Sequence, residues 1–184
     1  MKKLLRFKKR IIASVLTFAC AICRAHIARP MAVNVFNSIS QGERKLPIYC
    51  VDTDENKVAI SFDAAWGADD TDTLLDILKQ NNVKATFFMC GYWVDKYPEE
   101  VKKIASAGHD LGNHSATHPH MNSLSSEQIK KEIQDTHQKV LNLTGYEMEL
   151  FRPPFGEYNN TVIQAASECG YHTIQWDVDS LNMV

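Results

Sequence analysis

Two histidines lie four residues apart in the stretch Asn113–His118, "NHSATH". On a helical turn, side chains at positions i and i+4 point in the same direction, so His114 and His118 could share one cation. Zinc binds imidazole nitrogens and often takes a carboxylate as its third ligand, with a position left for water. Solvated loop histidines would show the same spacing, so the pair predicts a metal site only if other polar residues converge on it.

Two further residues have a type and a setting that suit catalysis. Asp63 directly follows the apolar run 58–62, "VAISF", and Arg152 precedes two prolines in "FRPPFG". A carboxylate beside an activated water can take its proton, which predicts a general base at Asp63. The prolines fix the backbone after Arg152, so its guanidinium is held where it can orient a carboxylate. A helix N-cap for Asp63 and an ordinary surface arginine are the alternatives.

Short apolar runs alternate with helical patterns from Val58 onward. The runs predict strands at residues 58–62, 83–89, 109–114, 148–151 and 171–176. The helical patterns predict four helices: one after residue 70, one from Val94 to Ile104, one from Ser125 or Ser126 to Leu141, and one over 161–169. Gly145 is expected to end the third. This alternation is typical of βαβ units and a parallel sheet, in which chemistry is found at the carboxyl ends of the strands. Asp63, both histidines, Arg152, Asp177 and Asp179 all fall at such ends.

The N-terminal region differs from the rest in charge. Residues 1–29 hold eight of the 20 Lys and Arg residues and no Asp or Glu, so the rest of the chain has 12 basic and 22 acidic residues. The basic start, followed by the apolar run 11–23, predicts a secretory signal peptide or an N-terminal membrane anchor within residues 1–29 and therefore an exported, extracytoplasmic protein. Residues 30–56 are polar and predict a linker. The acidic remainder argues against nucleic acid as a partner.

The cysteines do not predict a disulfide framework. Two of the five lie in the apolar run near the N-terminus, and Cys50, Cys90 and Cys169 are far apart and odd in number. We expect these three to be small buried or half-buried apolar residues.

Four segments carry a family resemblance: "SFDAAWG" (61–67), "HSATH" (114–118), "RPPFG" (152–156) and "WDVDS" (176–180). Residues 57–184 resemble the NodB-homology domain of the polysaccharide deacetylases, carbohydrate esterase family 4, most closely the subgroup linked to sporulation and cell walls. The resemblance implies an α/β fold, a distorted (β/α) barrel of the NodB-homology type with about five of its strands present. It also implies a divalent metal, most often zinc, and hydrolysis of N-acetyl groups from GlcNAc or MurNAc residues of peptidoglycan or a chitooligosaccharide-like glycan.

The same resemblance assigns roles by position. His114 and His118 would be metal ligands and Asp63 the catalytic base. Arg152 would hold that base, and the backbone N–H of Phe155 would help to stabilise the oxyanion, as such donors do in acyl transfer.

The sequence departs from the family pattern at three places. Ala64 stands where the family has a second Asp, the usual third metal ligand, so Asp63 itself or Asp69 is expected to complete the set. Asn182 and Met183 replace the second Asp and the Trp of the fourth motif. The last motif, Leu-x-His, whose histidine protonates the leaving amine, is absent, which suggests a C-terminally truncated domain.

Three hypotheses remain after these departures. The first is a metal-dependent polysaccharide N-deacetylase whose activity is reduced or lost in this form. The second is a non-catalytic glycan-binding or wall-associated protein, which Ala64 and the missing histidine favour and the intact histidine pair disfavours. A cytoplasmic enzyme acting on small amides is a third, and the predicted export signal argues against it.

Overall fold

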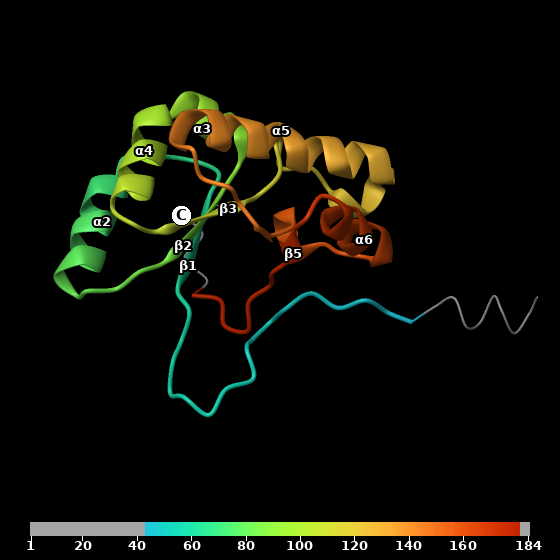
Figure 1. Ribbon diagram of the computed structural model, residues 1–184, viewed down its shortest axis with the longest axis horizontal. Coiled ribbons are helices and arrows are strands. Elements are labelled where there is room, and N and C mark those ends of the chain that lie inside the picture. The colour runs from blue at the N-terminus through green and yellow to red at the C-terminus, as the bar shows by residue number, and fades with distance from the viewer. Residues whose placement is uncertain (1–42, 181–184) are drawn as a thin grey trace, which may run out of the picture. The chain divides into compact units, whose positions relative to one another are not determined.

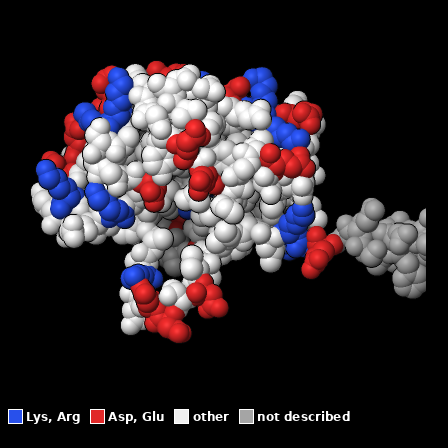
Figure 2. Space-filling model, viewed as in Figure 1, with Lys and Arg blue, Asp and Glu red and all other residues white. Residues whose placement is uncertain are grey.

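The computed structural model describes residues 43–180. The predicted signal peptide or anchor at residues 1–29 lies outside them, as do residues 30–42 of the predicted linker. The described residues from Lys45 onward belong to one compact unit, and none of its helices is long and apolar enough to cross a membrane. Figure 2 shows acidic and basic side chains interspersed over the visible face of this unit.

Five strands form one parallel sheet (Figure 1). The strands are β1 (Ser61–Ala64), β2 (Thr86–Met89), β3 (Asp110–Asn113), β4 (Leu150–Phe151) and β5 (His172–Thr173). Their order in the sheet is their order in the chain, and every neighbouring pair is parallel. Beyond β5, Ile48 forms a parallel bridge with Ile174. The predicted α/β fold with five parallel strands is confirmed.

The strands are shorter than their apolar runs, and β1 is displaced along the chain. It begins at Ser61, so Asp63 and Ala64 lie within the strand and not after it. The reason is the partner strand, because β2 begins only at Thr86, which pairs with Ser61. Val58, which precedes the paired segment, is 88% exposed. Apolar character alone therefore placed the strand about three residues too early.

The helices are α2 (Thr71–Gln80), α3 (Gly91–Lys96), α4 (Pro98–Ser106), α5 (Ser126–Thr144) and α6 (Asn160–Glu168). The single helix predicted from Val94 to Ile104 is wrong, because the chain breaks at Tyr97 into α3 and α4. Pro98 has no N–H to donate and disfavours helical backbone in the residue before it, and it becomes the first residue of α4 instead.

Helix α5 begins after Ser125, one of the two serines predicted as its N-cap, and ends at Gly145 as predicted. Ser125 and Gln128 form a reciprocal capping box, and Gly145 ends the helix in a left-handed conformation at φ 72°. Ile129, Ile133 and Val140 are fully buried along one face. In Figure 1, α3, α4 and α5 lie together on one side of the strands. This packing gives α5 a fixed position beside the carboxyl end of β3.

Candidate metal centre

Arg152 and Asp63 form an ion pair between the ends of β4 and β1. The Arg152 Nη1 group donates to Asp63 Oδ1 at 2.8 Å. The guanidinium carbon lies 4.0 Å from the ring centre of Phe88 and 5.5 Å from that of Trp176, so aromatic rings help to hold it. Arg152 is buried, whereas the Asp63 side chain remains 35% exposed. The second carboxylate oxygen of Asp63 therefore stays within reach of a ligand.

His114 directly follows β3, and a main-chain contact fixes its tautomer. Its Nδ1 atom lies 2.7 Å from the carbonyl oxygen of Arg152. A carbonyl can only accept, so Nδ1 carries the proton and Nε2 keeps its lone pair. That Nε2 atom lies 3.8 Å from Asp63 Oδ2. Histidine metal ligands have this arrangement, because one ring nitrogen is held by a carbonyl group and the other presents its lone pair. His114 and Asp63 therefore fit a cation between them.

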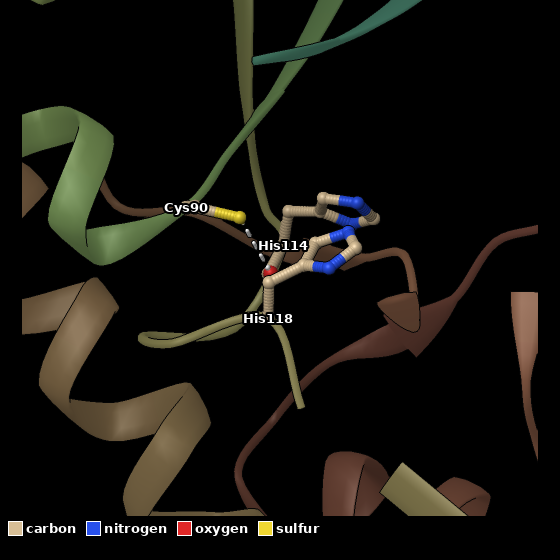
Figure 3. Close-up of side chains that lie close together, drawn as sticks. All are labelled: Cys90, His114 and His118. Atoms are coloured by element: carbon tan, nitrogen blue, oxygen red, sulfur yellow. Dashed lines mark hydrogen bonds between the residues drawn. The ribbon is translucent and has the colours of Figure 1, made fainter. Parts of the chain in front are cut away.

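His118 meets His114 through a loop. The predicted helical turn is wrong, since residues 114–118 are not helical, and Ser115 and His118 have φ angles of 67° and 58°. The two imidazole rings nevertheless lie with their centres 5.0 Å apart (Figure 3). The two rings are therefore close together, as the sequence spacing suggested, but a loop and not a helical turn brings them together.

Burial keeps both histidines neutral. It lowers the pKa of His114, although the Asp63 carboxylate opposes the shift, and it also lowers the pKa of His118. A metal binds the neutral imidazole, so these environments favour ligation near pH 7.

The metal-free protein is expected to lose stability as the pH falls from 7.5 to 5.5. A histidine in the unfolded chain has a pKa of about 6.5, whereas burial lowers the folded-state pKa of His109, His114 and His118. As the pH falls through about 6.5, the unfolded state takes up protons that the folded state does not, so the free energy of unfolding decreases. Urea unfolding in the presence of a chelator measures this slope. A stability that stays constant or rises over this range would contradict the expectation.

Cys90 is a third possible ligand that was not predicted from the sequence. Its sulfur and one nitrogen of each histidine all lie within 4.8 Å of one another. In Figure 3 the sulfur faces the main chain of the loop, and the thiol donates to the carbonyl oxygen of His114 at 3.3 Å. Burial raises the pKa of this thiol to about 12. Only the thiolate binds metal, so Cys90 is a poor ligand. It is a buried residue, as predicted.

The two carboxylates predicted as third ligand lie in different surroundings. Asp63 is next to His114, as described above. Asp69 lies exposed ahead of α2, and its charge acts on Lys96. Asp177 and Asp179 lie exposed after β5. Asp63 is therefore the candidate that the fold brings to the histidines.

Exposed aromatic rings border the histidine pair. Trp66 is 72% exposed with its ring centre 5.8 Å from that of His118, and Phe155 is 57% exposed at 4.5 Å. His120 stacks on Phe155 at 4.4 Å, and its Nδ1 atom lies 2.9 Å from Glu157 Oε1. Of these residues only Phe155 was predicted to belong to the site. The chain therefore has an aromatic rim beside His118, which we define as Trp66, Phe155 and His120.

The sequence matches the polysaccharide deacetylase family over residues 51–174, and the chain belongs to this family. It is 37% identical over 126 residues to a peptidoglycan-N-acetylglucosamine deacetylase of Bacillus cereus, covering 68% of this chain and 46% of that protein. It is 33% identical over 131 residues to the peptidoglycan-N-acetylmuramic acid deacetylase PdaA of Bacillus subtilis, covering 71% and 50%. The chain thus spans about half the length of these relatives.

Solved structures of the same family share the fold. A pseudoenzyme of carbohydrate esterase family 4 from Bacillus anthracis is 36% identical with a TM-score of 0.71, covering 73% of this chain and 48% of that one. A mutant of that pseudoenzyme with restored enzymatic activity is 38% identical with the same TM-score, covering 73% and 49%. The NodB-type architecture expected from the motifs is therefore confirmed for the described residues.

Proposed function

We propose that the protein is a zinc-dependent N-deacetylase of bacterial cell-wall glycan, acting on N-acetyl groups of GlcNAc or MurNAc residues. One observation carries the proposal: a neutral histidine lone pair and a carboxylate oxygen face each other at 3.8 Å, beside a second histidine. Two relatives named peptidoglycan deacetylases support the substrate class.

Zinc bound there would act as a Lewis acid that polarises the amide carbonyl and lowers the pKa of a water molecule. His114 and His118 would hold it. Asp63 would take the proton of the attacking water, while Arg152 keeps the Asp63 carboxylate oriented. The backbone N–H of Phe155 would stabilise the negative charge that develops on the carbonyl oxygen. The water oxygen would join the carbonyl carbon and the C–N bond would break, with the proton taken up by Asp63 passing to the leaving nitrogen, so that acetate and the sugar amine are released.

The aromatic rim suits a sugar polymer. The C–H faces of pyranose rings are apolar and pack on aromatic side chains, and exposed aromatic rings beside a polar site indicate a binding surface. Trp66 and Phe155 both lie next to His118. A glycan bound over them would bring an N-acetyl group to the histidine pair.

Export of the protein is part of this proposal. Peptidoglycan lies outside the cytoplasmic membrane, and the basic, then apolar, start of the chain is typical of a signal peptide or membrane anchor. A role in sporulation is a further expectation from the family subgroup.

Zinc titration by calorimetry tests the proposal. The unchanged protein is expected to bind one zinc ion, and a His114→Ala/His118→Ala variant none, because the variant lacks both imidazole ligands. His172→Ala is the matched control, since His172 lies exposed in β5. Acetate release from N-acetylchitooligosaccharide or peptidoglycan should follow zinc binding. Equal zinc binding by the parent and the double variant would exclude the site.

A second candidate function is glycan binding without turnover. Ala64 stands at the position of the family's usual third ligand, and one solved relative is a pseudoenzyme. This alternative predicts that the protein binds N-acetylated glycan but releases no acetate at saturating zinc.

A further inference from the structure

The loop 114–118 is anchored on one side by the start of α3. Gly91 N–H donates to the carbonyl oxygen of Ser115 at 2.9 Å, and Tyr92 N–H donates to that of Ala116 at 3.1 Å. These two bonds use the first N–H groups of α3, which have no partners inside the helix. They fix the carbonyl groups of the loop and leave its N–H groups to be bound elsewhere.

Glu132 binds the loop from the other side. Its Oε2 atom accepts from the N–H groups of Ala116 at 2.9 Å and Thr117 at 2.8 Å. Its Oε1 atom accepts from the Thr117 hydroxyl at 2.9 Å. One carboxylate thus receives three hydrogen bonds from two consecutive residues immediately before His118. Hydrogen bonds to an ionised acceptor are stronger than those between neutral groups.

The position of Glu132 is itself fixed by the core. Ile129 and Ile133, on either side of it in α5, are fully buried. The Asn113 side chain donates to the carbonyl oxygen of Ile133 at 2.8 Å and accepts from Ser115 N–H at 2.9 Å. Helix α5 and the end of β3 are therefore joined directly, which holds the backbone of Glu132 beside the loop.

The loop needs such support because its backbone is unusual. Ser115 and His118 both have positive φ angles, which residues with a Cβ atom rarely adopt without a surrounding structure that enforces them. His118 N–H donates to Ser115 Oγ at 3.0 Å, which closes the loop within itself. The direction of the His118 ring depends on these dihedral angles, and the contacts that fix them come from α3, from Glu132 and from Asn113.

We propose that Glu132 is a positioning residue that holds the loop 114–118 in the conformation in which His118 can bind a metal together with His114. The metal-binding part of this inference rests on the proposed function. Glu132 acts through the geometry of its three hydrogen bonds to the loop.

Two substitutions separate geometry from charge. Glu132→Ala removes all three hydrogen bonds, and we expect zinc affinity to fall about 10- to 100-fold, the usual effect of losing a group that orients a metal ligand. Glu132→Gln can keep them, because its oxygen accepts from both N–H groups and its amide donates to the Thr117 hydroxyl, so we expect nearly unchanged affinity. Glu127→Ala is the control, since Glu127 lies exposed in the same helix and its carboxylate pairs with Lys130.

Calorimetry with zinc and the visible spectrum of the cobalt-substituted protein measure the metal site, and NMR of the metal-free protein measures the loop. In Glu132→Ala, but not in Glu132→Gln, we expect faster hydrogen exchange at Ala116 and Thr117 and shifted ring resonances of His118. If the unchanged protein binds no zinc, the proposed function fails, and the NMR comparison still decides the role of Glu132.

Three results would overturn the inference. One is a Glu132→Ala variant whose zinc affinity and His118 resonances match the unchanged protein. Another is an equal loss in Glu132→Gln, which would assign the effect to charge. If Glu132→Ala does not fold, Thr117→Ala replaces it, because this variant removes one of the three hydrogen bonds. The third result would be a Thr117→Ala variant whose hydrogen exchange at residues 116 and 117 and His118 ring resonances match those of the unchanged protein.

Discussion

Replacing Ala64 with Asp is expected to raise zinc affinity more than 100-fold and to increase acetate release. A carboxylate bound directly to the metal should contribute more than the groups that merely orient ligands, whose loss costs about 10- to 100-fold. Ala64 is the last residue of β1, next to Asp63, and its carbonyl oxygen accepts from Cys90 N–H at 3.0 Å. It stands where the family motif has its usual third ligand.

The same substitution is expected to destabilise the metal-free protein. A second carboxylate beside Asp63, at a half-buried position, adds like-charge repulsion and a desolvation cost. Zinc would then stabilise the variant more than it stabilises the unchanged protein, because binding to the folded state adds to its stability. Thermal unfolding with and without zinc measures both effects.

Ala64→Asn is the matched control for size and polarity. An amide oxygen is a weaker zinc ligand than a carboxylate, so this variant should gain little affinity. Equal zinc affinity for the Asp and Asn variants would show that position 64 does not face the metal.

The parts of the fold that depend on local chemistry were predictable from the sequence. Ser125 or Ser126 was predicted to begin α5 and Gly145 to end it, and in the structure Ser125 is the N-cap and Gly145 the C-cap. Asp63 was assigned to a strand end because apolar character was the available signal. The true extent of β1 depends on its pairing with β2, which no local pattern records.

The candidate site was predictable in its residues but not in its construction. His114, Asp63 and Arg152 were identified by type and position, and the fold brings them together. The loop conformation that turns His118 toward His114 was not predictable, because it depends on Glu132, which lies 14 residues further along the chain. A glutamate among the polar residues of an amphipathic helix gives no signal of this contact in a single sequence.

Replacing Asp63 with Asn is expected to lower acetate release by about 10²- to 10⁴-fold, the usual contribution of a general base. The amide oxygen of the Asp63→Asn variant can still accept a hydrogen bond from Arg152 Nη1, so the site should keep its shape. The assay is best made in the Ala64→Asp background, where turnover is expected to be highest. Asp69→Asn is the control, because Asp69 lies exposed ahead of α2. Full activity in Asp63→Asn would exclude Asp63 as the base.

The zinc affinity of the Asp63→Asn variant decides whether Asp63 is also a metal ligand. Arg152 already occupies Asp63 Oδ1, so Oδ2 is the oxygen that faces His114. That oxygen can coordinate a metal or take a proton from water, and it cannot do both at once. If Asp63→Asn weakens zinc binding in the unchanged background but not in the Ala64→Asp background, Asp63 is a ligand only while position 64 is alanine. In that case the alanine would disable the base by drawing it onto the metal, and a carboxylate at position 64 would release Asp63 for catalysis.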